Sequence, residues 1–301
     1  MRVTQQMLTQ GSLTHMNESL ERLYALERQV ASGKRFEYPS DAPAIAAQSL
    51  TIKASMSAME AYIETGHTSQ AWMESTEFAS QHLADAALKA KNALLQGRND
   101  TMGAEERAVL AQEMDGILKS AMDLVNTQHL NRYIFAGYAT RTKPFEIIPA
   151  GSGVPPTTAD TIQYNGDHNI MMRNISPDET IAMNVDGDAA FRPLLEALIL
   201  ARDALNSNDT TAMDTALADM DTAEEALTDA MTKNGARVRT LSDAMSRMDM
   251  GLLELKALLS KKEDIDMAEA VSNLKMQENA YQIVLQVSGR MSSMMNLFDK
   301  I

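Results

Sequence analysis

Histidines are the first residues to test for chemistry, because imidazole is the commonest catalytic base and a frequent metal ligand. The chain has His15, His67, His82, His129 and His168. None of them lies in an H-E-x-x-H motif or pairs with another histidine four residues away, the spacing of a helical zinc site. There is also no cysteine, so disulfides and Cys-ligated zinc are excluded. We therefore expect no metal site.

Two other segments resemble ligand sites at first sight. Residues 151–153 (GSG) begin like a dinucleotide-binding loop, but Pro156 stands where the third glycine belongs. The acidic residues 263–266 (EDID) suggest calcium, yet the sixth loop position has no glycine, and carboxylates at a helix N-terminus are the simpler explanation. We find no acid–base pair or nucleophile arrangement. The sequence thus predicts a protein that is not an enzyme and has no cofactor.

The pattern with the clearest chemical consequence is apolar and lies at both ends of the chain. Residues 13–35 and 267–301 carry apolar side chains at helical spacings, which form a narrow stripe that a single helix cannot bury. Each end therefore requires a partner helix, and the other end is the nearest candidate. The predicted assembly interface consists of Leu13, Met16, Leu20, Leu23, Val30, Leu274, Tyr281, Val284, Met291, Met294 and Phe298.

The net charge of −14 is concentrated in the middle of the chain, whereas both ends are nearly neutral. Residues 203–229 contain eight carboxylates and no Lys or Arg, which is typical of a solvated helix face. A nucleic-acid partner is not expected, because phosphate recognition depends on Lys and Arg. No apolar run is long enough to predict a membrane span, and the first 20 residues lack the apolar core of a cleaved signal peptide.

The elements that would position these stripes are mostly helices, as the Ala-, Leu- and Met-rich composition indicates. Helices are predicted over about 4–32, 41–95, 105–133, 191–206, 210–233, 235–260 and 264–299. A Pro- and Gly-rich segment interrupts them, and we predict a β-hairpin there that joins 162–164 to 170–172 through Asn165-Gly166.

The predicted fold class is mainly α, a long helical bundle with its N- and C-terminal helices paired as a coiled coil and a small β-rich insertion. Three parts are expected. Residues 1–40 and 262–301 form a terminal coiled-coil domain, residues 41–143 and 191–261 form a helical bundle domain, and residues 144–190 form the β-rich outer insertion.

Several motifs resemble those of the bacterial flagellin superfamily. Residues 32–36 (SGKRF) and 39–43 (PSDAP) resemble its S-G-K-R-I…S-D-D-P segment, although Ala42 replaces the second aspartate. Residues 131–138 (NRYIFAGY), closed by 143–145 (KPF), look like the Y-L-F-A-G…P-F segment of its hook–filament junction branch. The same resemblance extends to residues 1–4, 263–270, 281–282 and 297–299.

This resemblance implies a structural adaptor at the hook–filament junction, with its termini paired in the inner tube of the flagellum and its insertion facing outwards. The implied partners are other copies of the chain in a ring, the neighbouring hook-associated protein on the hook side and flagellin on the filament side. It also implies export through the flagellar type III apparatus with a dedicated chaperone, and hence an extracellular location on the flagellum.

Two alternatives have the same terminal pattern. A flagellin-type filament subunit is the nearer one, but flagellins generally close with an A-Q-A-N segment and a Leu-Arg ending, neither of which is present here. A cytoplasmic regulatory coiled-coil protein is the other. It would have stable terminal helices in solution and no export.

Overall fold

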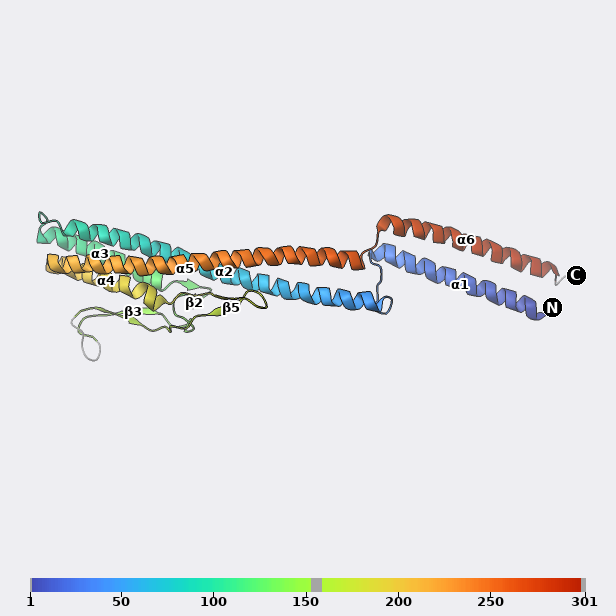
Figure 1. The fold of residues 1–301 in the computed structure, drawn as a ribbon, viewed down its shortest axis with the longest axis horizontal. Coiled ribbons are helices and arrows are strands. Elements are labelled where there is room, and N and C mark those ends of the chain that lie inside the picture. The colour runs from blue at the N-terminus through green and yellow to red at the C-terminus, as the bar shows by residue number, and fades with distance from the viewer. Residues whose placement is uncertain (1, 153–158, 299–301) are drawn as a thin grey trace. The chain divides into compact units, whose positions relative to one another are not determined.

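The computed structural model describes residues 2–152 and 159–298, and most of them are helical. The helices are α1 (Arg2–Ser32), α2 (Pro43–Gly97), α3 (Ala104–Val125), α4 (Gly187–Ser207), α5 (Thr210–Glu263) and α6 (Met267–Phe298) (Figure 1). The strands are β1 (Gln128–His129), β2 (Arg132–Tyr133), β3 (Phe145–Ile148), β4 (Thr161–Tyr164), β5 (Met172–Asn174) and β6 (Thr180–Ala182). The predicted fold class, mainly α with a small β-rich insertion, is confirmed.

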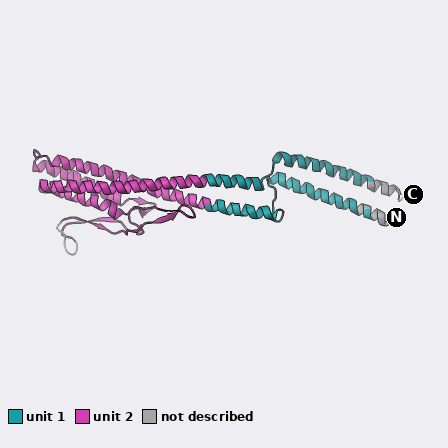
Figure 2. Ribbon diagram, viewed as in Figure 1, with its two compact units in different colours: residues 1–58, 250–301 teal, residues 59–249 magenta. Residues whose placement is uncertain are grey.

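The chain divides into two compact units (Figure 2). Unit 1 consists of residues 1–58 and 250–301, and unit 2 consists of residues 59–249. Helices α2 and α5 each contribute one end to unit 1 and the rest to unit 2. The three-part division expected from the sequence, with its boundaries near residues 40, 143, 190 and 261, stays a prediction.

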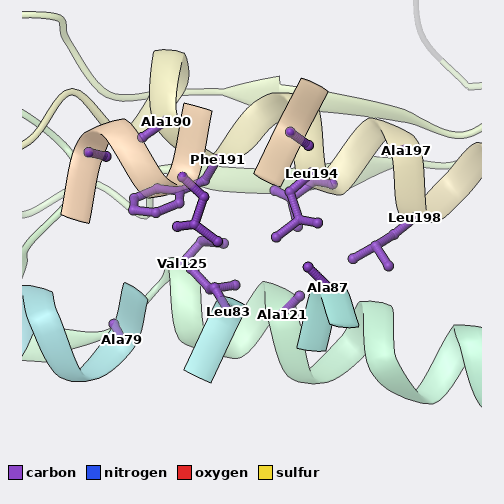
Figure 3. Close-up of a cluster of buried hydrophobic side chains, with 14 of the residues drawn as sticks. Ala79, Leu83, Ala87, Ala121, Val125, Ala190, Phe191, Leu194, Ala197 and Leu198 are labelled. Atoms are coloured by element: carbon purple, nitrogen blue, oxygen red, sulfur yellow. The ribbon is translucent and has the colours of Figure 1, made fainter. Parts of the chain in front are cut away.

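Unit 2 contains the hydrophobic core, which is made mainly by α2, α3, α4 and α5 (Figure 3) and is completed by side chains of the β-rich segment, such as Phe145. Leu83, Leu194 and Leu198 are completely buried, and alanines such as Ala87 and Ala121 let the helices approach closely. A fully buried Leu or Phe side chain stabilises the folded state by roughly 1.5–3 kcal/mol. Unit 2 therefore has a hydrophobic core of its own.

Helix α3 ends at Val125, so the prediction of a helix up to residue 133 is wrong. Asn126 stops the helix because its side chain is engaged elsewhere: Nδ2 donates to the Met122 and Phe145 carbonyl oxygens, and Oδ1 accepts from the Phe145 N–H (3.1 Å). The chain then forms the β1–β2 hairpin, whose two turn residues, Leu130 and Asn131, have φ of 49° and 61°. This is the mirror-image turn that two-residue hairpins favour.

The predicted hairpin that turns on Asn165-Gly166 is also wrong. Strand β4 pairs with β3, with Phe145 opposite Tyr164, and β5 pairs with β6. Asn165 donates its backbone N–H to the Pro144 carbonyl (2.8 Å) instead of closing a turn towards Ile170. Gly166 lies against the Tyr164 ring, and a Cβ at Gly166 would come within 2.5 Å of that ring.

Helix α5 is a single helix of 54 residues, not the two helices expected on either side of residue 234. The buried Asn234 belongs inside it, since its Nδ2 donates to the Met73 carbonyl and to the Glu77 carboxylate on α2, both at 3.1 Å. Helix α4 begins four residues earlier than predicted, because Asp186 caps it by accepting from the Asp188 and Ala189 N–H groups.

Candidate assembly surface

The two terminal helices, α1 and α6, pack against each other within unit 1 and run antiparallel (Figure 1). Polar contacts between them set the register. Ser12 and Ser288 hydroxyl oxygens are 2.7 Å apart, and Gln277 Nε2 donates to the Ser19 carbonyl (3.1 Å) and hydroxyl (3.0 Å). Because Ser19 is buried, its bond with Gln277 satisfies a polar group inside the pair.

The structure brings most of the predicted interface residues to this pair. Leu23 is buried, and six others are half-buried, namely Met16, Leu20, Val30, Leu274, Tyr281 and Val284. Leu13 is 51% exposed. The side chains of Met291, Met294 and Phe298 lie outside the described residues. The role of the whole set in assembly stays a prediction.

Unit 1 has almost no interior. Among its described residues, the apolar side chains classed as buried are Leu23, Ile52, Leu252 and Ala270, each still 7–9% exposed. The connected core of buried residues lies entirely in unit 2. Fixing one backbone residue costs about 1–2 kcal/mol, and most helical stability in proteins comes from packing of an apolar face. We therefore expect the terminal helices to need further contacts to be held in place.

Exposed apolar side chains are concentrated in the same unit. Met276, Ile283 and Val287 are 60%, 60% and 51% exposed and recur at spacings of seven and four, so they share one face of α6. That face differs from the one through which Gln277 and Ser288 contact α1. Further exposed residues of unit 1 are Met7, Leu13, Tyr24, Tyr38, Leu50, Met250, Leu253, Leu258, Met267 and Leu285.

The stripe of Met276, Ile283 and Val287 was missed in the sequence, although its 7/4 spacing is a readable signal. Only the stripe that includes Leu274 and Val284 was chosen there. A helix with two apolar faces contacts two neighbours. In unit 1 the first neighbour of α6 is α1, and the second face remains exposed.

A network of ion pairs joins the end of α1 to the end of α5 within unit 1. The ammonium group of Lys34 lies 2.6 Å from an Asp264 carboxylate oxygen and 3.4 Å from Glu263, and Lys53 reaches Glu263 at 2.6 Å. Backbone bonds reinforce it, from Arg35 N–H to the Glu263 carbonyl (2.6 Å) and from Ile265 N–H to the Gly33 carbonyl (3.1 Å). The SGKR motif and the acidic segment 263–266 thus bind each other. The carboxylates that resembled calcium ligands in the sequence are therefore partners of lysine side chains.

This network shifts the ionisation of its carboxylates. Burial by itself would raise the pKa of Glu263, but hydrogen bonds from Lys53 and Lys34 outweigh it and hold that pKa below its usual range. The hydrogen bond from Lys34, and then that from Ser260, lower the pKa of Asp264. A lowered carboxyl pKa stabilises the folded state at pH values above the unfolded pKa, about 4, and this contribution is lost as the pH falls through the folded pKa.

Glu263→Gln is expected to weaken unit 1 by about 1–3 kcal/mol, because a buried charged acceptor is lost and two ammonium groups lose a partner. Hydrogen exchange of residues 29–35 and 260–266 measures this opening, and unit 2 should be unaffected. Above about pH 5 the difference between the two proteins should be constant, and it should shrink as both are acidified below about pH 4. Glu254→Gln on the exposed side of α5 is the matched control.

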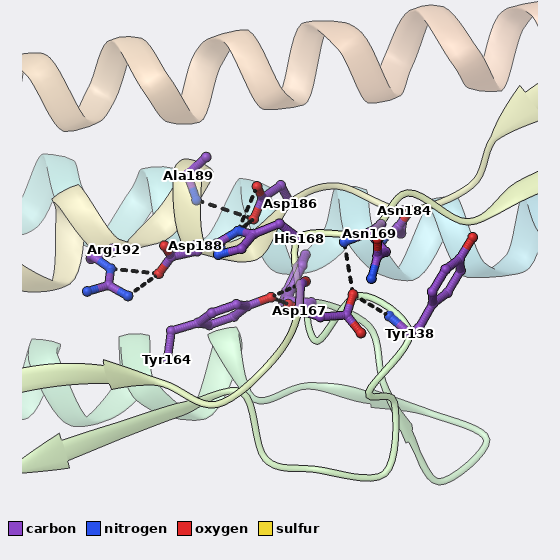
Figure 4. A network of polar contacts seen from close by, with 11 residues as sticks. Tyr138, Tyr164, Asp167, His168, Asn169, Asn184, Asp186, Asp188, Ala189 and Arg192 are labelled. Atoms are coloured by element: carbon purple, nitrogen blue, oxygen red, sulfur yellow. Dashed lines mark hydrogen bonds and ion pairs between the residues drawn. The ribbon is translucent and has the colours of Figure 1, made fainter.

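The second family motif, in unit 2, has a structural role. Residues Ile134, Phe135 and Ala136 are completely buried, and Gly137 has φ of 61° with Asp167 against it, so a Cβ at this position would collide with that residue. The hydroxyl of Tyr164 lies 2.9 Å from the carbonyl oxygen of Phe135 and 3.0 Å from that of Asp167, and its one proton is shared between these two acceptors. Tyr164 and Asp167 are labelled in Figure 4. Burial raises the pKa of Tyr164, so the hydroxyl keeps its proton. These contacts fasten the β-rich segment to the bundle.

Neither a metal site nor a membrane span is found in the part of the chain that the structure describes. No three His, Asp or Glu side chains converge there in a way that could hold a metal ion. None of the described helices is long and apolar enough to cross a bilayer. Of the glycine-rich loop, Gly153 and Pro156 lie outside the described residues.

Comparisons with known proteins agree with the fold. The bacterial flagellin N-terminal helical region matches residues 3–140, which contain nearly all of α1, the first family motif and residues 131–138 of the second. The crystal structure of the flagellar junction protein FlgL from Legionella pneumophila has the same fold, with a TM-score of 0.60 at 14% identity, over 72% of this chain and 99% of that one. The chain is therefore similar to flagellin over residues 3–140 and shares its fold with this structure.

Sequence similarity is more specific. The chain is 25% identical to flagellar hook-associated protein 3 of Salmonella typhimurium over 275 residues, which cover 88% of this chain and 82% of that protein. It is 24% identical to flagellar hook-associated protein 3 of Escherichia coli K12, over 94% of each protein. The resemblance inferred from the motifs is confirmed, and it is to hook-associated protein 3 in particular.

Proposed function

We propose that this chain is a structural component of the bacterial flagellum, an adaptor that joins hook to filament and assembles through its terminal helices. The observation that carries the proposal is the contrast between the two units. Among the residues whose side chains the structure describes, unit 2 has an extensive core, whereas unit 1 has almost no interior and holds most of the large exposed apolar side chains. Surfaces of this kind mark protein–protein contacts.

The partners in this proposal are other copies of the chain in a ring, a hook-associated protein on the hook side and flagellin on the filament side. A dedicated chaperone would shield the terminal helices before export through the flagellar type III apparatus. The function requires no catalysis. Similarity to hook-associated protein 3 along most of the chain favours this role over a flagellin-type filament subunit.

The deciding experiment removes the chain from its cells and follows flagellin. A junction adaptor predicts hooks without filaments and flagellin released into the medium, because the filament has nothing to attach to. Immunogold labelling of normal flagella should then mark a single short zone next to the hook. Labelling along the filament would instead establish a filament subunit, and absence from purified flagella would favour a cytoplasmic regulator.

A further inference from the structure

A pocket of about 230 Å³ lies in unit 2 between helix α5 and the segment that leads into α4. Asn184, Asp186 and Ala189 form one of its sides and are labelled in Figure 4. Part of its wall is apolar, formed by alanines from both α4 and α5 together with Ile170 and Val185. The rest is formed by polar and charged side chains, namely Asn184, Asp186, Asp229, Lys233 and Arg237. The proposed function uses no part of it.

The charged groups of the pocket are paired, with one exception. Asp229 binds Lys233 at 2.6 Å, and Asp186 binds His168 at 3.1 Å while it caps α4. Arg237 has no ion pair among the described residues. Its Nη1 donates to the Asn184 carbonyl (2.8 Å), which leaves the other N–H groups of the guanidinium available.

Without an ion-pair partner, the partly buried charge of Arg237 is unfavourable, and a bound anion would stabilise it. Arg237 is partly buried, and this burial lowers the pKa of its guanidinium. By contrast, Arg202 elsewhere in unit 2 contacts Asp160 and Asp203. A guanidinium presents parallel N–H donors that match the two oxygens of a carboxylate.

We propose that this pocket binds a carboxylate group carried on a short apolar stem, which Arg237 holds through its free N–H groups while the alanine-lined walls contact the stem. The same chemistry has two sources, a free short-chain carboxylate or the acidic side chain of a neighbouring protein chain. This site is independent of the proposed function, because it lies in unit 2 and uses none of the terminal residues.

The test measures thermal unfolding of the full chain with propionate, with N-acetylglutamate methylamide and with its glutamine analogue, at equal ionic strength set by sodium chloride. At about ten times the Kd, a carboxylate should raise the Tm of unit 2 by about 3–6 °C. The glutamine analogue should have no effect. If propionate stabilises unit 2 as much as N-acetylglutamate methylamide does, the ligand is a free carboxylate. If only the glutamate compound stabilises it, the ligand is an acidic side chain of a neighbouring protein chain.

Variants distinguish binding from a purely structural role for Arg237. Arg237→Gln should abolish the carboxylate-dependent rise, and Arg237→Lys should reduce it, whatever either change does to the Tm without ligand. Arg239→Gln, an exposed arginine two residues further along α5, should keep the full rise. Absence of any rise in the unaltered chain, or the same rise in Arg237→Gln, would overturn the proposal.

Discussion

Val284→Asp is expected to remove the chain from assembled flagella while leaving unit 2 folded. Val284 is half-buried and lies seven residues after Gln277 and four before Ser288, so it shares the face of α6 that pairs with α1. A carboxylate there must lose water without gaining a hydrogen-bond donor, which costs about 1–3 kcal/mol. Since each 1.4 kcal/mol changes an equilibrium about tenfold, incorporation should fall roughly ten- to hundredfold.

The measurement is the amount of each variant in purified flagella, with the Tm of the free protein as a check on folding. Val109→Asp is the matched control, because Val109 is 64% exposed on α3 in unit 2 and the chemical change is the same. The control should incorporate normally. Normal incorporation of Val284→Asp would mean that pairing of α1 with α6 is not needed for assembly.

The parts of the fold that sequence periodicity could predict are those where one helical face meets a core. The 3/4 spacing around Leu23 and Val284 indicated the terminal pair. The end of α1 was also readable, because Gly33 adopts the left-handed conformation (φ of 69°) that ends many helices. Pro43 likewise marked the start of α2.

The errors arose where side-chain contacts across the molecule override local signals. Asn126 ends α3 through bonds to Phe145, which lies 19 residues later. Asn234 sits inside a helix because α2 provides its hydrogen-bond acceptors. The Asn165-Gly166 pair looked like a hairpin turn, but the Tyr164 ring occupies the space beside it. Local sequence preference is a weak guide to secondary structure where contacts with residues distant in sequence determine it.

The candidate surface was predictable only in part. The sequence showed that the ends carry apolar stripes. It did not show that Lys34 and Lys53 form ion pairs with Glu263, and that these ion pairs connect the end of α1 to the end of α5. The second apolar face of α6 was also missed, although its 7/4 spacing is visible in the sequence, because the stripe of Leu274 and Val284 beside it already accounted for one partner. Burial in the structure separates them, since one face contacts α1 and the other is exposed.

The second large effect concerns the terminal helices of the free chain. Because unit 1 buries so few apolar side chains, α1 and α6 should open with a free energy near zero, whereas the buried helices of unit 2 should open only with the global unfolding of that unit. A difference of about 3 kcal/mol or more in opening free energy corresponds to at least roughly a hundredfold difference in exchange rate. Assembly should then protect both helices.

Hydrogen exchange of the full chain, free and within purified flagella, tests this account most directly. In the free chain, amides of residues 2–32 and 267–298 should exchange at least roughly a hundredfold faster than those of the α2, α3 and α4 segments in the core of unit 2, and they should slow strongly in the flagellum. The account would be contradicted if the terminal helices were as well protected in the free chain as those core segments. Contacts with neighbouring subunits would then not be needed to stabilise unit 1.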